Sequence, residues 1–150
     1  SEKDAQQNSS ISGDWAFKFT VNNDFVKESL HINPGINIKS KGIEVNVKHI
    51  IIRPTGKVEA KLKVNNSDGK NYLFFIEGKN DKGELLELES SYSDRKETTL
   101  IQSELSKLRV DRDALKNFTF KLYASQMPEK NGYYDENENK FQVGSDFVIK

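Results

Sequence analysis

Cysteine is absent from this chain of 150 residues, and so is any long apolar run. Without cysteine there can be no disulfide bond and no thiolate metal site. No stretch of about 18 consecutive apolar residues is present to span a membrane as a helix, and no secretory signal peptide is visible. Any membrane anchor is therefore expected upstream of residue 1.

The chain also lacks an excess of charge of one sign, since Lys plus Arg and Asp plus Glu both number 23. Nucleic-acid-binding domains normally have a basic excess, so this balance argues against a nucleic-acid partner. The length suits one domain, and nine Phe, five Tyr and one Trp supply large apolar groups for its core. Residues 1–11 are mostly polar and are expected to form a tether, with the folded domain in residues 12–150.

What the chain has in quantity is alternation of apolar and polar residues with a period of two. The alternation is clearest in residues 15–21, 58–64 and 118–124, where every second residue is apolar. Successive side chains of a strand point to opposite faces, so each segment predicts a strand with one buried face and one solvated face. This pattern is typical of antiparallel sheets, because parallel strands covered by helices are continuously apolar.

Weaker alternation predicts further strands in residues 26–38, 72–76 and 85–88, and a last strand that begins near Phe141. Glycine-bearing turns separate the segments, because glycine supplies the positive φ that tight turns need. These turns are expected at residues 33–35, 54–56, 65–69 and 81–83.

Residues 43–53 predict a strand whose apolar pattern changes phase at Ile50. A phase change inside one strand indicates a β-bulge or a crossing between sheets. Pro54 ends this strand because proline has no backbone donor. Residues 98–105 predict a strand and residues 113–116 a short helical turn, with one helix over residues 103–117 as the alternative.

Residues suited to catalysis are few. His31 and His49 both lie in strand-like segments without a nearby acidic partner at ligand spacing, whereas a zinc site needs a third ligand. No nucleophile elbow and no glycine-rich phosphate loop is present. Glu84, Glu87 and Glu89 alternate with leucines and predict a solvated sheet edge. We therefore expect a protein that is not an enzyme.

The segment around residue 135 is the most suggestive cluster of polar side chains. Asp135, Asn137 and Asn139 place oxygen ligands at alternate positions, which is typical of a calcium loop, and Asp146 follows eleven residues after Asp135. Such a loop needs glycine where Lys140 stands. A solvated acidic hairpin loop is the simpler interpretation, so no cofactor is expected unless calcium binds here.

Two other features suggest ligand contact. Tyr133 and Tyr134 could form an exposed aromatic platform for a sugar or a peptide, although such pairs also plug cores. Lys57, Lys61 and Lys63 could attract anionic wall polymers, or could protect an edge strand from aggregation.

Two stretches resemble a known family. Gly13, Trp15, Phe17 and Phe19 form a Gly-x-Trp-x-Phe-x-Phe strand, and residues 43–47 are followed by Ile50-Ile51-Ile52-Arg53-Pro54-Thr55-Gly56. This pairing resembles the extracytoplasmic immunoglobulin-like domains of unknown function in Gram-positive anti-sigma-factor-like membrane proteins. Arg53 stands where that family's pattern has serine, and residues 115–120 are similar to its closing strand.

The resemblance implies an all-β, antiparallel immunoglobulin-like β-sandwich with at most one short helical turn. It also implies a non-catalytic extracellular domain of a membrane-anchored regulator, which binds a protein or cell-wall partner or acts as a spacer. The alternative is a secreted or wall-associated adhesin or polymer-binding module. The family provides no functional residue to match.

Overall fold

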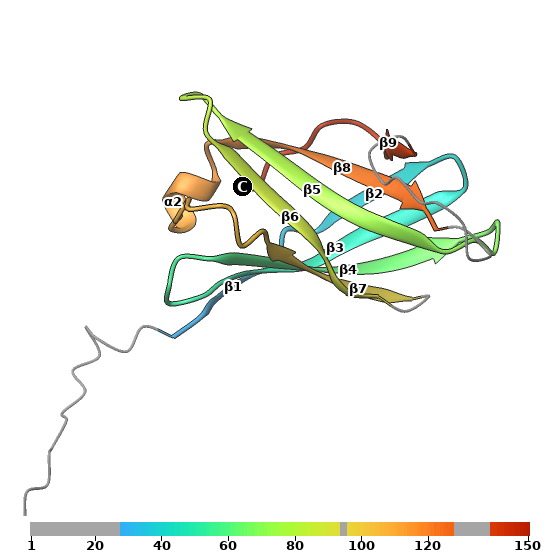
Figure 1. Ribbon diagram of the computed structural model, residues 1–150, viewed down its shortest axis with the longest axis horizontal. Helices are drawn as coiled ribbons and strands as arrows, with labels where there is room; N and C mark the ends of the chain where they lie inside the picture. The colour runs from blue at the N-terminus through green and yellow to red at the C-terminus, as the bar shows by residue number, and fades with distance from the viewer. Residues whose placement is uncertain (1–27, 94–95, 128–138) are drawn as a thin grey trace, which may run out of the picture.

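The computed structural model describes residues 28–93, 96–127 and 139–150. Its strands and its one short helix are shown in Figure 1. They are β1 (Leu30–Ile32), β2 (Ile36–Ser40), β3 (Ile43–Ile52), β4 (Val58–Asn66), β5 (Tyr72–Asn80), β6 (Leu85–Ser93), β7 (Glu97–Gln102), α2 (Arg112–Leu115), β8 (Phe118–Gln126) and β9 (Lys140–Gln142). The predicted strand at residues 15–21 lies outside the described residues.

The nine strands form one hydrogen-bonded antiparallel sheet in the order β1-β3-β4-β7-β6-β5-β8-β9. β2 also pairs with β3, beside the first half of that strand, while β1 lies beside the second half. The prediction of an all-β, antiparallel fold is confirmed. Two separate sandwich sheets are not confirmed, because hydrogen bonds join all the described strands into one sheet.

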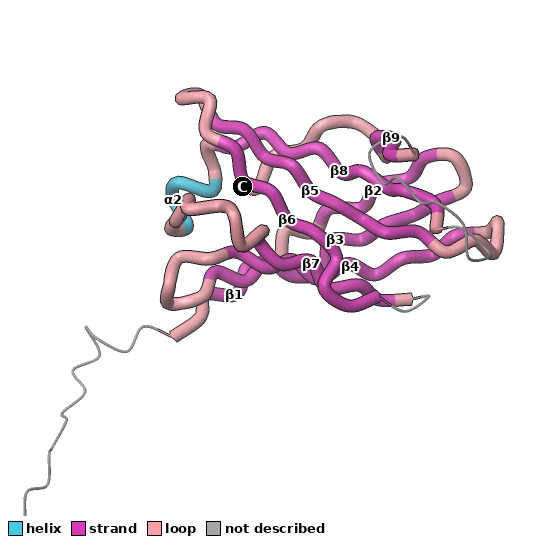
Figure 2. The backbone as a smooth tube through the Cα atoms, in the orientation of Figure 1, coloured by secondary structure: helices cyan, strands magenta, loops and turns pink. Residues whose placement is uncertain are grey.

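The sheet folds over on itself, so that β5, β6 and β8 lie across β3, β4 and β7 (Figures 1 and 2). Apolar side chains from both halves fill the space between them as one core. Val45 and Leu62 come from one half, and Phe74 and Leu122 from the other; all four are buried. This closed core is produced by the period-two alternation, because each strand turns its apolar side inward.

The alternation in β4 and β8 is confirmed position by position. In β4 the residues Val58, Ala60, Leu62 and Val64 are buried, and Lys61 and Lys63 between them are exposed. In β8 every second residue from Phe118 to Ala124 is buried in the same way. The apolar residues of these two strands therefore face the core, and the residues between them are exposed or half-buried on the outer face.

The phase change predicted in β3 is a β-bulge. The register between β3 and β4 shifts between Val47 and His49, so Lys48 is an extra residue on β3. The bulge keeps Val47 and Ile50 both on the core side despite their odd spacing. The turn that follows is also present, because the Gly56 N–H donates to the Arg53 carbonyl oxygen over 2.8 Å.

The region after β7 differs from its prediction. β7 ends at Gln102 rather than at residue 105, and Leu105 is 91% exposed. The long helix weighed as an alternative is wrong, because the helix spans Arg112–Leu115 alone. It begins where the Asp111 side chain accepts a hydrogen bond from the Ala114 N–H, which is an N-cap contact.

Two predicted sheet edges are in fact interior strands. β6 is paired on both sides, with β5 and with β7, so Glu87 and Glu89 lie on its solvated face and not at an edge. β4 lies between β3 and β7. Protection of an edge therefore does not explain Lys61 and Lys63.

No helix in the described part of the chain is long and apolar enough to cross a membrane.

Candidate binding surface

The structure describes one of the five residues predicted as ligand or metal contacts. Asn139 is exposed and directly precedes β9. Tyr133, Tyr134, Asp135 and Asn137 lie outside the described residues. Within residues 28–93, 96–127 and 139–150, no group of three or more His, Asp or Glu side chains is placed to hold a metal ion.

Asp146 is engaged by neighbouring side chains. The Lys121 ammonium group lies 3.0 Å from Asp146 Oδ2, and the Gln142 amide donates to Asp146 Oδ1 over 2.7 Å. The hydrogen bond from Gln142, followed by that from Lys121, lowers the pKa of the Asp146 carboxyl. These contacts tie the end of the chain to β8 and β9.

The two histidines have different surroundings. His31 is exposed on β1, and His49 follows the bulge in β3 and shares a hydrogen bond of 2.7 Å with the Asn33 side-chain oxygen. That bond ties β3 to the turn between β1 and β2. A structural role for His49 fits this contact.

A polar surface lies on the outer side of β2, β3 and β4, and we call it the lysine–asparagine face. The strands turn their apolar side chains to the core, so the alternate side chains are left on this face. It consists of Asn37 and Lys39 from β2, Glu44, Asn46 and Lys48 from β3, and Lys61, Lys63 and Asn65 from β4.

The strand register places these side chains in rows across the sheet. One row runs through Asn37, Asn46 and Lys63, because Asn46 pairs with both of the others. The next row joins Lys39 to Glu44 and Glu44 to Asn65. Neighbouring strands lie about 4.8 Å apart, so lysine and asparagine side chains within a row are close enough to contact one ligand.

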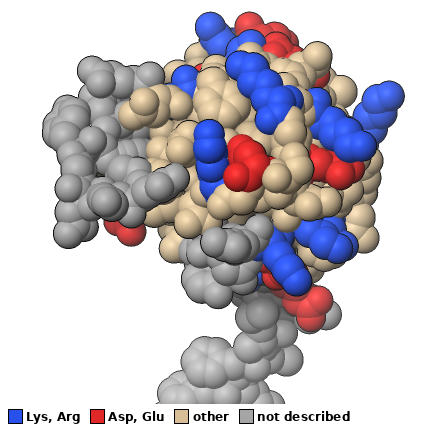
Figure 3. Space-filling view, turned by 90° about the vertical axis from the view of Figure 1, so that its right-hand side faces the viewer, with Lys and Arg blue, Asp and Glu red and all other residues tan. Residues whose placement is uncertain are grey.

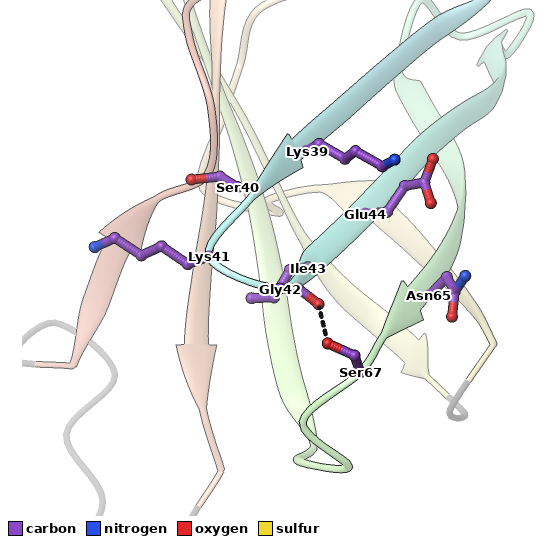
Figure 4. A pocket seen from close by; sticks show the side chains of 8 residues that line it. All are labelled: Lys39, Ser40, Lys41, Gly42, Ile43, Glu44, Asn65 and Ser67. Carbon is purple, nitrogen blue, oxygen red and sulfur yellow. Dashed lines mark hydrogen bonds between the residues drawn. The ribbon is translucent and has the colours of Figure 1, made fainter.

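Two hollows open on this face. One of about 500 Å³ is lined by Asn37, Glu44, Asn46, Lys48, Lys63 and Asn65. The other, of about 410 Å³, lies beside the turn between β2 and β3 and shares Glu44 and Asn65 with the first. In Figure 4 Lys39, Glu44 and Asn65 extend from three neighbouring strands, whereas Lys41 points away from them. The shared residues make the two hollows neighbours on one surface.

The lysines of this face form no ion pair with an acidic side chain in the described part of the chain. The ion pairs found there, Arg53 with Glu59 and Lys121 with Asp146, lie elsewhere. Glu44 lies within the face, and one of its oxygens accepts a hydrogen bond of 2.8 Å from the Asn37 amide. Two further glutamates border the face: Glu97 of β7 pairs opposite Lys63, and Glu59 precedes Lys61 by two residues on the same side of β4. The four lysines of the face therefore outnumber the three glutamates within it and at its border by one, although the whole chain is neutral. Figure 3 shows the end of the molecule at the right of Figure 1, where Lys and Arg side chains lie interspersed with Asp and Glu side chains.

The outer side of β5 and β6 has a different character. A hollow of about 310 Å³ is lined there by Glu77, Glu87 and Glu89, with Phe75 and Lys140. The Lys140 ammonium group lies 4.7 Å from the centre of the Tyr123 ring and 5.2 Å from that of Phe75, which are cation–π distances. The acidic side chains are thus separated from the lysine–asparagine face.

Sequence reasoning singled out Lys61 and Lys63 but missed their neighbours on β2 and β3. Asn37, Asn46 and Asn65 are unremarkable in sequence, because each is one polar position of an alternating strand. Their grouping depends on the register between strands, which no short-range pattern specifies.

No family model, no curated protein and no solved structure matches this chain.

Proposed function

We propose that this chain is the non-catalytic extracytoplasmic domain of a membrane-anchored regulator of the anti-sigma-factor type, and that it acts by binding. The observation on which the proposal depends is the lysine–asparagine face. Its polar groups project from paired strands that are fixed by the core beneath, and the core does not require lysine or asparagine at those positions. Binding sites on such strands are well positioned for a partner.

Regulation by this domain requires a partner that distinguishes two states. A ligand can shift an equilibrium only if it binds the two states with different affinity. A partner outside the membrane would meet this condition if it bound the face more tightly in one state of the regulator than in the other. The immunoglobulin-like character of the domain and its partner protein or polymer are part of the proposal.

The topology is tested with the complete gene product. We expect it to sediment with membranes, and the present domain to be degraded by protease added to cells whose wall has been removed. A cytosolic marker protein serves as the control for intact membranes. Recovery of the complete product in the cytosolic fraction would contradict the proposal.

A secreted or wall-associated adhesin or polymer-binding module is the second candidate. The exposed lysines of the face favour it, because wall polymers are commonly anionic. Retention of the purified chain on isolated cell walls would support this function. If Tyr133 and Tyr134 contribute, their replacement by alanine lowers retention, whereas replacing the exposed Leu85 and Leu105 does not.

A further inference from the structure

The lysine–asparagine face combines cations with neutral hydrogen-bonding groups at regular spacing. Alternate residues of one strand lie roughly 6.6–6.8 Å apart, so the Cα atoms of Lys61 and Lys63 are separated by about this interval along β4 and their side chains leave the same face. Lys48 lies on the neighbouring strand and lines the same hollow as Lys63. These separations are below the Debye length of about 8 Å at physiological ionic strength, so the charges attract an anion jointly.

These cations are available to a ligand. Lys39, Lys48, Lys61 and Lys63 are all exposed, and none of them forms an ion pair with another described residue. Lys41, at the turn between β2 and β3, is excluded from the set because its ammonium group lies 5.2 Å from the centre of the Phe141 ring. The attraction for anions thus comes from the strands themselves.

The amides restrict the choice of anion. Asn46 and Asn65 make no side-chain hydrogen bond to another described residue, and both line the hollows. A side-chain amide offers two donors and one acceptor oxygen, which suits a hydroxyl group. Glu44 repels a phosphate but accepts a hydrogen bond from a hydroxyl. The face therefore matches a ligand that has both anionic groups and hydroxyl groups.

Nucleic acid fits this face less well. Proteins that bind single strands stack the bases on aromatic side chains, and the eight residues that define the face include no aromatic residue. An acidic peptide would pair with the lysines but would leave most of the amides without hydroxyl partners. A polymer that alternates phosphate and hydroxyl-bearing units satisfies both kinds of side chain.

We infer that the lysine–asparagine face binds a linear polyol phosphate, with the lysines on the phosphate groups and Glu44, Asn46 and Asn65 on the hydroxyl groups. This inference rests on the binding role proposed above and specifies its ligand. The polymer lies across β2, β3 and β4 over the two hollows.

The first test measures binding of a fluorescent poly(glycerol phosphate) oligomer to the purified chain by anisotropy. The triple variant Lys48→Gln/Lys61→Gln/Lys63→Gln is compared with Lys79→Gln/Lys82→Gln/Lys116→Gln, which removes the same charge from exposed positions elsewhere. We expect a loss of about fivefold for each lysine removed from the face, as for basic residues at anionic membrane surfaces. The control variant should change affinity by less than about twofold, because distant charges are screened.

The second test separates hydroxyl recognition from charge attraction. Asn46→Ala/Asn65→Ala is expected to weaken binding of poly(glycerol phosphate) about tenfold, given two lost hydrogen bonds, and to leave binding of inorganic polyphosphate unchanged. Circular dichroism and thermal unfolding of each variant confirm that the fold is intact.

Three results would overturn the inference. The first is that the oligomer does not bind at low salt, and the second is that both lysine variants lose the same amount of affinity. The third is that a single-stranded oligonucleotide of equal charge binds as tightly as the polyol phosphate. Each of them leaves the membrane-topology test unaffected, so failure of this ligand and failure of the proposed function are distinguishable.

Discussion

Phe120 lies directly opposite Gly78 across the β5–β8 pair, and its ring fills the space that a side chain at Gly78 would need. A Cβ atom added to Gly78 would lie 2.6 Å from Phe120 Cε1. The Phe120 ring also stacks on Phe118 and on Phe147, with ring centres 5.9 and 5.5 Å apart. The glycine thus leaves room for a stack of aromatic rings at this position of the sheet.

Gly78→Ala is expected to destabilise the protein by about 1–3 kcal/mol, the usual cost of overpacking a core. Chemical unfolding measures the difference. Combining Gly78→Ala with Phe120→Leu should cost less than the sum of the two single changes, because the smaller side chain removes the clash. Additive costs would show that the close approach has no energetic consequence.

Gln102 is a buried polar residue with all of its groups engaged. Its side-chain oxygen accepts from the Val58 N–H over 3.0 Å, and its amide donates to Ser106 Oγ and to the Leu108 carbonyl. Gln102→Leu leaves the buried Val58 N–H without a partner, and we expect a loss of about 1–3 kcal/mol in unfolding free energy. Ser106→Ala removes one part-buried contact of the Gln102 amide and leaves the Val58 bond in place, so it should cost less. Equal costs would contradict a central role for the Val58 bond.

Tyr72 should titrate at unusually high pH. Burial, together with its hydrogen bond to Asp68, raises the pKa of the Tyr72 phenol to about 12, from about 10 in an unfolded chain. A raised pKa stabilises the fold fully below pH 10, and this contribution is lost as pH rises towards 12. The near-ultraviolet phenolate absorbance that Tyr72→Phe removes should therefore titrate near pH 12. A midpoint near 10 would contradict the contact.

The contribution of Asp68 to stability has the opposite pH dependence. The hydrogen bond from Tyr72, followed by that from the Lys70 N–H, lowers the pKa of the Asp68 carboxyl. A lowered pKa stabilises the fold above the unfolded value of about 3.9, and the contribution is lost as pH falls through the folded-state pKa. The difference in melting temperature between wild type and Asp68→Asn should shrink between pH 5 and pH 2.5. A constant difference would contradict a role for the charge.

The ion pair between Arg53 and Glu59 should add little to the free energy of unfolding. The contact is bidentate, with distances of 2.7 and 2.9 Å, but the Arg53 side chain is 45% exposed. Glu59→Gln is therefore expected to cost less than about 1 kcal/mol, and the cost should fall as salt is added. A larger, salt-independent loss would show that the pair is shielded from solvent.

Much of the strand content could be predicted because it is encoded locally. The alternation in residues 58–64 and 118–124 is visible in sequence, and so is the phase change that the bulge at Lys48 produces. β7 was predicted too long because pairing with β6 ends at the hydrogen bond from the Ser103 N–H to the Glu87 carbonyl oxygen, and Leu105 lies beyond it. The exposed Leu105 shows that an apolar residue at a strand end need not be part of the core.

The arrangement of the strands could not be predicted in the same way. β4 is followed in sequence by β5, yet its two partners in the sheet are β3 and β7. The choice depends on how β5, β6 and β7 pack together over β3 and β4, which involves contacts distant in sequence. The lysine–asparagine face has the same origin, because Asn46 meets Asn37 and Lys63 through register and not through sequence spacing.

The position of β7 between β4 and β6 affects folding during translation. On the ribosome, β1 to β6 all emerge before β7, the strand that pairs with both β4 and β6. Until β7 emerges, one side of β4 and one side of β6 have an unpaired backbone. Open strands of this kind readily pair with other chains. Translation pauses that delay residues 97–102 should therefore increase aggregation of the newly made protein more than pauses placed after β8.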